Sequence, residues 1–274
     1  MDAVSREAYT SAVERLDSFA TGGRPVPLAG VADEILGVAK LLLRQPRLRR
    51  ALSDPSRPGE DRAGLFGSIL EGKVSEDAAT LLRTLVTGRW SSSTELLSAT
   101  ERLGVEALLA SAQSAGELSD VEDELFRFGQ TVDGDNQLAA ALGASSVPTE
   151  RRSALAHSLL DNKARAATIR LVDVALDGFG GRNFATGLTR IVEMAAERRD
   201  RQLAYVTVAT PLSDQDEARL AGRLSQIYGR QVEVKVTVDP DVLGGASVRI
   251  GPDLYDGTIS RRLAQVKSGL VGNR

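Results

Sequence analysis

An internal repeat covers much of the first two thirds of this chain of 274 residues. Residues 28–88 align without a gap onto residues 118–178, at an offset of 90, with 17 identities in 61 positions. Identical pairs include Leu28/Leu118, Val31/Val121, Leu48/Leu138, Leu52/Leu142, Pro58/Pro148, Leu70/Leu160 and Gly88/Gly178. Because chance would supply only a few identities, the repeat predicts one helical module present twice, beginning near Leu28 and near Leu118.

The apolar residues of the first copy recur at helical spacing, with Val31, Ile35, Val38 and Leu42 on one face. Further helices are predicted to begin near Pro46, Pro58, Ser75 and Ser93, because Pro and Ser are common at helix starts. The helix from Ser93 is long and ends near Ala115. The second copy has no first helix of its own unless this long helix serves both copies.

An amphipathic helix over residues 5–20 precedes the first copy. Its side chains Tyr9, Ala12, Val13 and Leu16 recur at helical spacing and share one face. Packing into a core is the simplest role for such a face.

After Arg201 the apolar pattern changes from helical spacing to alternation. Residues 232–238 alternate valine with polar side chains, which is the period of a half-buried strand. Similar alternation predicts strands over 204–208 and 248–250, and Ser213 is placed to cap a helix between the first two strands. The order of these elements is typical of a small α/β domain.

Turn and cap residues delimit the end of this domain. Gly244-Gly245 supplies backbone freedom for a turn before the last strand, and Gly251-Pro252 breaks the strand pattern. Asp256 is placed to cap a final helix.

These patterns predict a multidomain α plus α/β chain. An N-terminal helical bundle over residues 1–117 is followed by a duplicated helical unit over 118–201 and a small C-terminal α/β domain over 202–274.

Composition limits the classes of function. With 42% apolar and 26% charged residues, the chain is typical of a globular protein, and its most apolar stretch, residues 35–43, is too short to cross a bilayer. Residues 1–20 carry charges throughout and do not resemble a signal peptide. The absence of cysteine excludes disulfides and thiol catalysis, and the net charge of -3 gives no reason to expect nucleic acid or anionic lipid as main partner. The cytoplasm is the default location.

Two isolated motifs resemble parts of a nucleotide-binding or catalytic site but lack the residues that such a site needs. Residues 67–73 spell GxxxxGK, yet Val74 follows where a phosphate-binding loop needs Ser or Thr, and the apolar spacing around it is helical. His157 is the only histidine, and no set of side chains converges on it in the sequence. We therefore predict no catalytic residue, no cofactor-binding residue and no metal ligand.

Near the C-terminus, a set of residues at fixed spacing is more informative about the protein family than any one of these residues alone. It consists of Asp239, Val242-Leu243, Gly244-Gly245, Val248, Arg249, Gly251, Asp256-Gly257 and Arg262-Leu263. This set resembles the signature of the delta subunit of F-type ATP synthases, the homologue of the mitochondrial oligomycin sensitivity-conferring protein. The duplicated helical part is similar to the enlarged delta subunits of actinobacteria.

The resemblance implies a non-catalytic stator subunit that links the catalytic head to the peripheral stalk and so supports coupling of proton flow to ATP synthesis. It implies alpha and beta head subunits and a b-type stalk subunit as partners, with no nucleic acid. The expected location is the cytoplasmic face of the bacterial plasma membrane, peripheral and reached only through the complex.

The resemblance also points to partner-binding residues. In the family, the first and fifth helices of a six-helix bundle form a groove for the N-terminal peptide of an alpha subunit. The helix that matches the first one here carries Tyr9, Ala12, Val13 and Leu16. The C-terminal domain of the family binds the b-type subunit, and the residues expected to matter there are Leu243, Gly244, Gly245, Asp256 and Gly257.

Other classes of function remain as alternatives. An RNA-binding or general protein-scaffold module would also use a C-terminal α/β domain, although the predicted strands lack the aromatic pair on which RNA bases stack. An enzyme would need a convergent acid, base or nucleophile set, and the sequence offers none.

Overall fold

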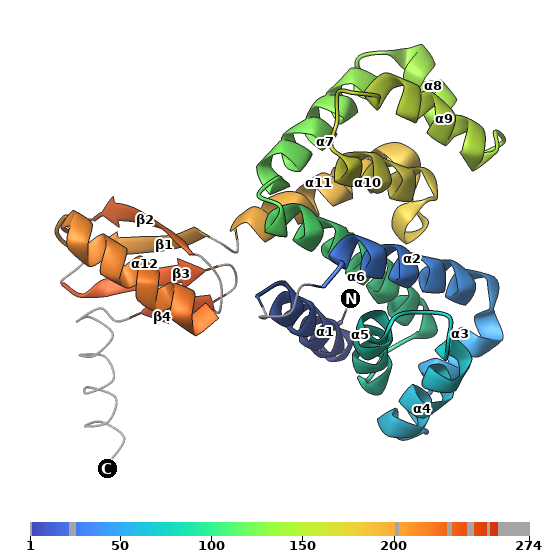
Figure 1. Cartoon of the computed structure of the whole chain (residues 1–274), viewed down its shortest axis with the longest axis horizontal. Coiled ribbons are helices and arrows are strands. Elements are labelled where there is room, and N and C mark those ends of the chain that lie inside the picture. The colour runs from blue at the N-terminus through green and yellow to red at the C-terminus, as the bar shows by residue number, and fades with distance from the viewer. Residues whose placement is uncertain are drawn as a thin grey trace, which may run out of the picture. The chain divides into compact units, whose positions relative to one another are not determined.

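The structure, a computed structural model, describes residues 2–21, 26–200, 203–228, 232–239, 244–250 and 253–256. The chain divides into a helical unit, Met1–Ala195, and a C-terminal unit, Ala196–Arg274, which carries the sheet (Figure 1). The prediction of a mostly helical chain with a small α/β part is confirmed. Among the described residues, no helix is both long and apolar enough to cross a membrane.

The helical unit begins with a bundle whose helices follow the apolar pattern of the sequence. They are α1 (Ala3–Thr21), α2 (Leu28–Arg44), α3 (Pro46–Leu52), α4 (Gly59–Leu70), α5 (Glu76–Thr87) and α6 (Ser93–Ser114). Pro46 takes the first position of α3, and Ser75 Oγ accepts a hydrogen bond from the Ala78 backbone N–H at the start of α5. Helix α6 begins at Ser93, as predicted, and Ser92 caps it in the same way.

The rest of the helical unit repeats this order. Its elements are α7 (Leu118–Asp133), α8 (Asn136–Gly143), α9 (Thr149–Leu160), α10 (Ala166–Leu176), the short 3-10 helix η1 (Phe179–Gly181) and α11 (Phe184–Asp200). The helices α7, α8, α9 and α10 each begin 90 residues after α2, α3, α4 and α5, and α6 begins 90 residues after α1.

Local contacts recur at the same offset. Glu34 Oε2 accepts the backbone N–H of Ser75 at 2.9 Å, and Glu124 Oε2 accepts that of Arg165 at 2.8 Å. The turn after α4 has a positive φ at Gly72, and the turn after α9 has one 90 residues later, at Asn162. Asparagine is the common substitute for glycine in this backbone conformation.

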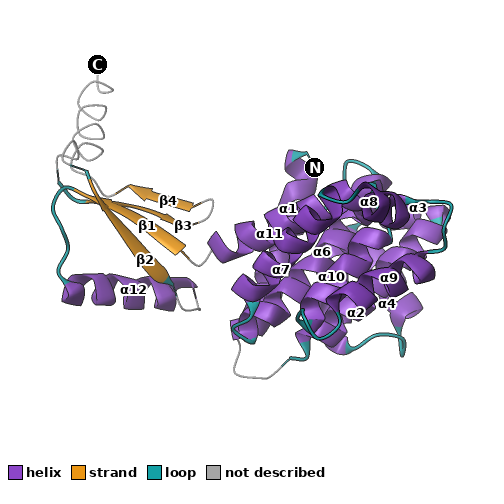
Figure 2. Ribbon diagram, turned by 90° about the horizontal axis from the view of Figure 1, so that it is seen from above, coloured by secondary structure: helices purple, strands orange, loops and turns teal. Residues whose placement is uncertain are grey.

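The long helix α6 lies in the middle of the helical unit, with the other helices around it (Figure 2). It packs against α1, α2, α3 and α5, which precede it in the sequence, and against α7 and α10, which follow it. A continuous apolar cluster runs from Ala8 to Ala195, and Leu103 and Leu108 of α6 are almost fully buried in it. Thus α6 packs with both copies of the repeat.

Arg62 ties together three helix ends of the first bundle. Its side chain is 3% exposed and donates hydrogen bonds to the carbonyl oxygens of Leu52, Thr87 and Gly88. Replacement by methionine leaves these carbonyls without their charged donor, so we expect Arg62→Met to lower the free energy of unfolding by about 2–3 kcal/mol.

The repeat supplies the control for this prediction. Arg152, at the equivalent position, donates to the Leu142 carbonyl and to Thr149 Oγ1 and is less buried. Arg152→Met should therefore cost about 1 kcal/mol. Urea denaturation of the two variants measures the difference, and equal losses would contradict this account of Arg62.

The described part of the C-terminal unit is a four-stranded sheet with one helix. Its elements are β1 (Leu203–Val208), α12 (Asp214–Tyr228), β2 (Glu233–Val238), β3 (Ala246–Ile250) and β4 (Asp253–Asp256), and the strand order is β2-β1-β3-β4. Strand β1 runs parallel to β2, with Val206 opposite Val236, and antiparallel to β3, with Val206 opposite Val248. The buried valines come from alternate positions of the strands, and α12 packs against β2.

Two sequence expectations for this unit need comment. Strand β4 was not predicted, because four residues after a Gly-Pro pair are too few to show alternation. The final helix expected after Asp256 lies outside the described residues, and Asp256 itself is the last residue of β4.

Candidate functional site

The four residues predicted on α1 form the inner face of that helix. Tyr9, Ala12, Val13 and Leu16 are 8%, 0%, 8% and 0% exposed, and α1 packs against α5 and α6. The ring of Tyr9 also lies 4.7 Å from the guanidinium carbon of Arg102. These side chains therefore build the core of the bundle, and the surface that α1 offers to a partner consists of other residues.

A groove runs between α1, α4 and α5 on the outer side of the bundle. We call it the first groove; it has a volume of about 640 Å³ and is lined by Val4, Glu7, Ala8, Ser11, Glu60, Ala63, Thr80, Arg83, Thr84, Thr87, Gly88 and Arg89. The floor is made of small apolar and hydroxyl side chains, whereas two acidic and two basic side chains balance one another. This lining suits a partner with an apolar face better than an ion.

The first groove depends on a close approach of α1 to the end of α5. A Cβ atom added at Gly88 would lie 2.2 Å from the Cβ of Ala8, so only glycine fits there without a shift of α1. One sequence pattern corresponds to the groove. Val4, Glu7 and Ser11 follow helical spacing on α1, but only one of them is a large apolar residue, so they do not form an apolar stripe that predicts a binding face.

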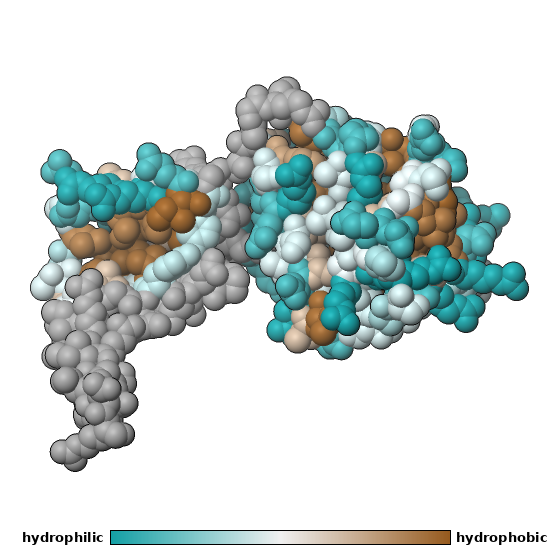
Figure 3. Space-filling model, turned by 90° about the horizontal axis from the view of Figure 1, so that it is seen from below, coloured by the Kyte–Doolittle hydropathy of each residue, from teal (hydrophilic) through white to brown (hydrophobic). Residues whose placement is uncertain are grey.

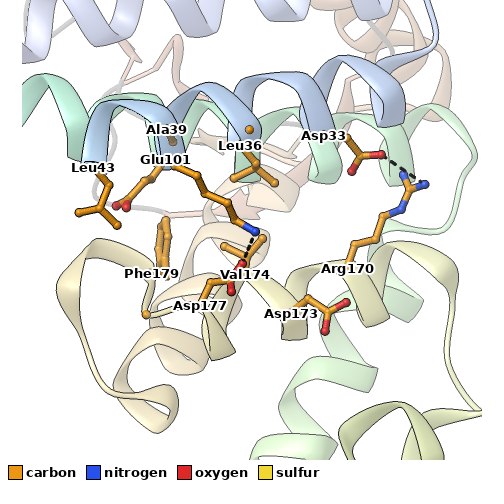
Figure 4. Close-up of a pocket in the computed structure, with 13 residues that line it drawn as sticks. Asp33, Leu36, Ala39, Leu43, Glu101, Arg170, Asp173, Val174, Asp177 and Phe179 are labelled. Atoms are coloured by element: carbon orange, nitrogen blue, oxygen red, sulfur yellow. Dashed lines mark ion pairs between the residues drawn. The ribbon is translucent and has the colours of Figure 1, made fainter. Parts of the chain in front are cut away.

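A second cavity lies between α2, α6 and α10. We call it the second groove; it has a volume of about 320 Å³ and is lined by Asp33, Leu36, Gly37, Ala39, Lys40, Leu43, Glu101, Arg170, Asp173, Val174, Asp177, Gly178 and Phe179. Figure 4 shows α2 across one side of the cavity and α10 on the other. Ion pairs join the two sides, at 2.7 Å between Lys40 Nζ and Asp177 Oδ2 and at 3.5 Å between Arg170 and Asp33.

Glu101 is the carboxylate most deeply placed in the second groove. Its burial raises its pKa above the ordinary value, because desolvation disfavours the charged form. The backbone N–H of Gly180, which donates to Glu101 Oε2 at 3.0 Å, and the charge of Arg182 act in the opposite direction.

Glu101→Gln is therefore expected to stabilise the chain at neutral pH, where glutamine keeps an acceptor for Gly180 but has no charge to desolvate. A carboxyl group whose pKa is raised by folding destabilises the folded chain when it is ionised. This loss in the free energy of unfolding is therefore present above the raised pKa and disappears as the pH falls below the ordinary pKa of the group. The melting temperature of the variant should exceed that of the wild type by about 1–2 °C at pH 7.5. A gain that does not shrink on acidification would contradict this cause.

The motifs set aside in the sequence have structural roles. Gly67 lies inside α4, and Lys73 Nζ donates to the carbonyl oxygen of Ile69 at 2.7 Å, so this segment ends a helix and does not form a phosphate-binding loop. His157 Nε2 lies 2.9 and 3.0 Å from the carboxylate oxygens of Asp173. Across the described ranges, no group of three acidic or histidine side chains is placed to hold a metal ion.

Few of the C-terminal candidates can be placed. Gly244 and Gly245 have φ of 108° and 84°, in the region that favours glycine, and lead directly into β3. Leu243 and Gly257 lie outside the described residues. The C-terminal unit also exposes large apolar side chains, since Ile227 is 71% and Val238 44% exposed, and Figure 3 shows a hydrophobic area on this unit at the left.

Comparison with known proteins identifies the family. The model of the family "ATP synthase delta (OSCP) subunit" matches residues 105–270. The chain is 59% identical over 269 residues to ATP synthase subunit delta of Salinispora arenicola, with 98% of each chain covered. It is 42% identical to that of Streptomyces griseus and 36% identical to that of Thermobifida fusca, in both cases over 99% of this chain and 100% of the relative. The chain therefore belongs to the ATP synthase delta (OSCP) subunit family, whose members are structural, non-catalytic stator subunits of F-type ATP synthase.

Proposed function

We propose that this stator subunit holds the catalytic head with the first groove and the peripheral stalk with its C-terminal unit. The observation that carries the proposal is the open groove between α1 and α5, the first and fifth helices of the N-terminal bundle. In the delta subunits that this sequence resembles, an alpha-subunit peptide binds between the first and fifth helices of a six-helix bundle. The partners are then the alpha and beta subunits of the head and a b-type stalk subunit, at the cytoplasmic face of the bacterial plasma membrane.

An amphipathic helix fits the first groove on chemical grounds. Val4, Ala8 and Ala63 offer apolar surface, and the threonines of α5 add short side chains that let a helix approach closely. Such a helix lays its apolar face into a groove, as in other helix-in-groove complexes, while charged residues at the rim select its orientation. The N-terminal segment of an alpha subunit is our proposed occupant.

The buried face of α1 supports this site from below. Tyr9, Ala12, Val13 and Leu16 hold α1 against α5 and α6, and the position of α1 sets the width of the groove. Their contribution to head binding is thus indirect.

The stalk site is proposed on the exposed apolar surface of the C-terminal unit. Ile227 at the end of α12 and Val238 at the end of β2 are too exposed to contribute much to folding, and exposed apolar side chains of this size favour burial against a partner. A helix of the b-type subunit would bury them. The turn at Gly244 and Gly245 and the segment with Leu243, Asp256 and Gly257 remain proposed contacts.

The two helical copies are proposed to descend from one duplicated module. The equal offset of helix starts and the repeated hydrogen bonds of Glu34 and Glu124 support this origin. In this proposal the N-terminal bundle, the second helical unit and the C-terminal α/β domain together connect the head to the stalk. Its task is to keep the head still while the rotor turns, so that torque is used at nucleotide sites of other subunits.

Copurification tests the proposal. A tagged chain recovered from membranes should bring alpha, beta and b-type subunits together, and Ile227→Glu should lose the b-type subunit while it retains alpha and beta. Recovery of RNA, or of none of these subunits, would contradict the proposed function.

A further inference from the structure

The first and second grooves occupy the same positions of the repeat. All six residues that α10 and the segment directly after it give to the second groove lie 90 positions after residues of the first groove, and so does the one residue from α6. The equivalent pairs are Ser11/Glu101, Thr80/Arg170, Arg83/Asp173, Thr84/Val174, Thr87/Asp177, Gly88/Gly178 and Arg89/Phe179. The chain therefore contains one wall of this groove twice, once on α5 with Ser11 of α1 opposite and once on α10 with Glu101 of α6 opposite.

The remaining walls differ, since α1 and α4 complete the first groove and α2 completes the second. In the second groove, α2 contributes Asp33, Leu36, Lys40 and Leu43 as a further wall, and the cavity has half the volume of the first groove. Figure 4 shows α2 above α10, with both ion pairs between them. Among the described residues, the helices that line the first groove are α1, α4 and α5.

The position of α2 is set by its packing on α6. Gly104 of α6 has no side chain, and a Cβ atom added there would lie 2.6 Å from the side chain of Leu36. This contact brings α2 close to α6 and holds it over the second groove. Exposed ion pairs contribute little to stability, so we assign them the smaller role of aligning α2 with α10.

The charges of the second groove are matched inside the chain. Each of its basic residues is paired with an aspartate of the groove, Asp173 contacts His157, and Glu101 accepts the backbone N–H of Gly180. A groove prepared for a charged partner would present charges to it instead.

We propose that the second groove is an internal joint, closed by α2 of the same chain, and that only the first groove takes a helix from outside. The proposal rests on the proposed function of the first groove and adds which copy binds the head and how many helices a chain accepts. It has a specific consequence, because the family model matches residues 105–270 and thus includes α10 but not α1 or α5. The head is then held by the part of the chain that precedes the matched segment.

A reversible lock on α2 tests the joint. The chain has no cysteine, so Lys40→Cys combined with Asp177→Cys places the only two thiols on either side of the second groove. A short bifunctional thiol reagent then ties α2 to α10, and the same variant without reagent is the control. We expect the locked chain to bind the isolated catalytic head with an affinity within about twofold of the control, at one chain per head.

A loss of affinity of about tenfold or more on locking would overturn the joint, because the second groove would then have to open for the head. The variant Thr84→Lys, which blocks the first groove, separates this outcome from a failure of the proposed function. If locking and Thr84→Lys both weaken binding, the first groove keeps its role and the joint is refuted. If neither does, the proposed function of the first groove is refuted, and with it the statement that this groove takes a helix from outside, whereas closure of the second groove by α2 is not contradicted.

Discussion

Replacement of Leu16 by aspartate is expected to unfold the first helical bundle. The Leu16 side chain is 0% exposed and lies in the continuous apolar cluster of the helical unit. A carboxylate there has to be desolvated or protonated, and the packing of the leucine is lost as well, so we expect a loss of about 4 kcal/mol or more in the free energy of unfolding. Thermal denaturation followed by circular dichroism measures the effect.

The outer face of the same helix supplies the control. Ser11 is exposed and lines the first groove, so Ser11→Asp should leave the melting temperature unchanged. Head binding should be weakened by both variants, but only Leu16→Asp should lose helical signal. A Leu16→Asp chain as stable as the wild type would show that α1 does not pack as described.

The second large effect is expected from Thr84→Lys. Thr84 lies on α5 in the first groove, partly exposed, and its hydroxyl donates to the Thr80 carbonyl oxygen of its own helix. A lysine in this position would fill the groove and place a charge under the apolar face of the bound helix. We expect the dissociation constant for the isolated head to rise about 30-fold, the size of a hot-spot effect.

Folding should be preserved in this variant, because a lysine is a good helix former and the position is partly exposed. Ser68→Lys is the matched control, since Ser68 is exposed on α4 and does not line the groove. Isothermal titration of each variant with the head gives the affinity. Full affinity of Thr84→Lys would exclude the first groove as the head site.

Most of the helical architecture could be predicted from periodicity and caps. Pro46, Pro58 and Ser75 mark helix starts that the structure has within one residue, because proline and serine satisfy or avoid the free N–H groups of a first turn. The offset of 90 also fixed the places of α7 to α10. What periodicity could not show is that α6 packs with both copies, since that follows from long-range packing and not from local spacing.

The candidate site was harder to predict, for a physical reason. The strongest apolar stripe of α1, with Ala12 and Leu16, is strong because the bundle buries it, and burial in the core is the usual fate of such a stripe. The first groove is lined instead by small and hydroxyl residues such as Ser11 and Thr84. In our proposal these residues bind a partner through the shape of the groove, and sequence alone gives them no distinguishing pattern.

The pairing of the two grooves shows a further limit of sequence reasoning. Val174 and Thr84 occupy equivalent positions, yet one faces α2 and the other an open groove. The difference arises because α2 of the first copy lines the second groove, whereas α1 and α4 line the first. Equivalent positions of the two copies therefore have different surroundings, which depend on the helices that pack against each copy.

ATP-driven proton pumping by membrane vesicles that lack this chain tests the account most directly. The account predicts that the depleted enzyme still hydrolyses ATP, because the nucleotide sites belong to other subunits, but no longer acidifies the vesicle interior. Added wild-type chain should restore acidification, and Thr84→Lys should restore it only at much higher concentration. Depleted vesicles that acidify as well as intact ones would contradict the account.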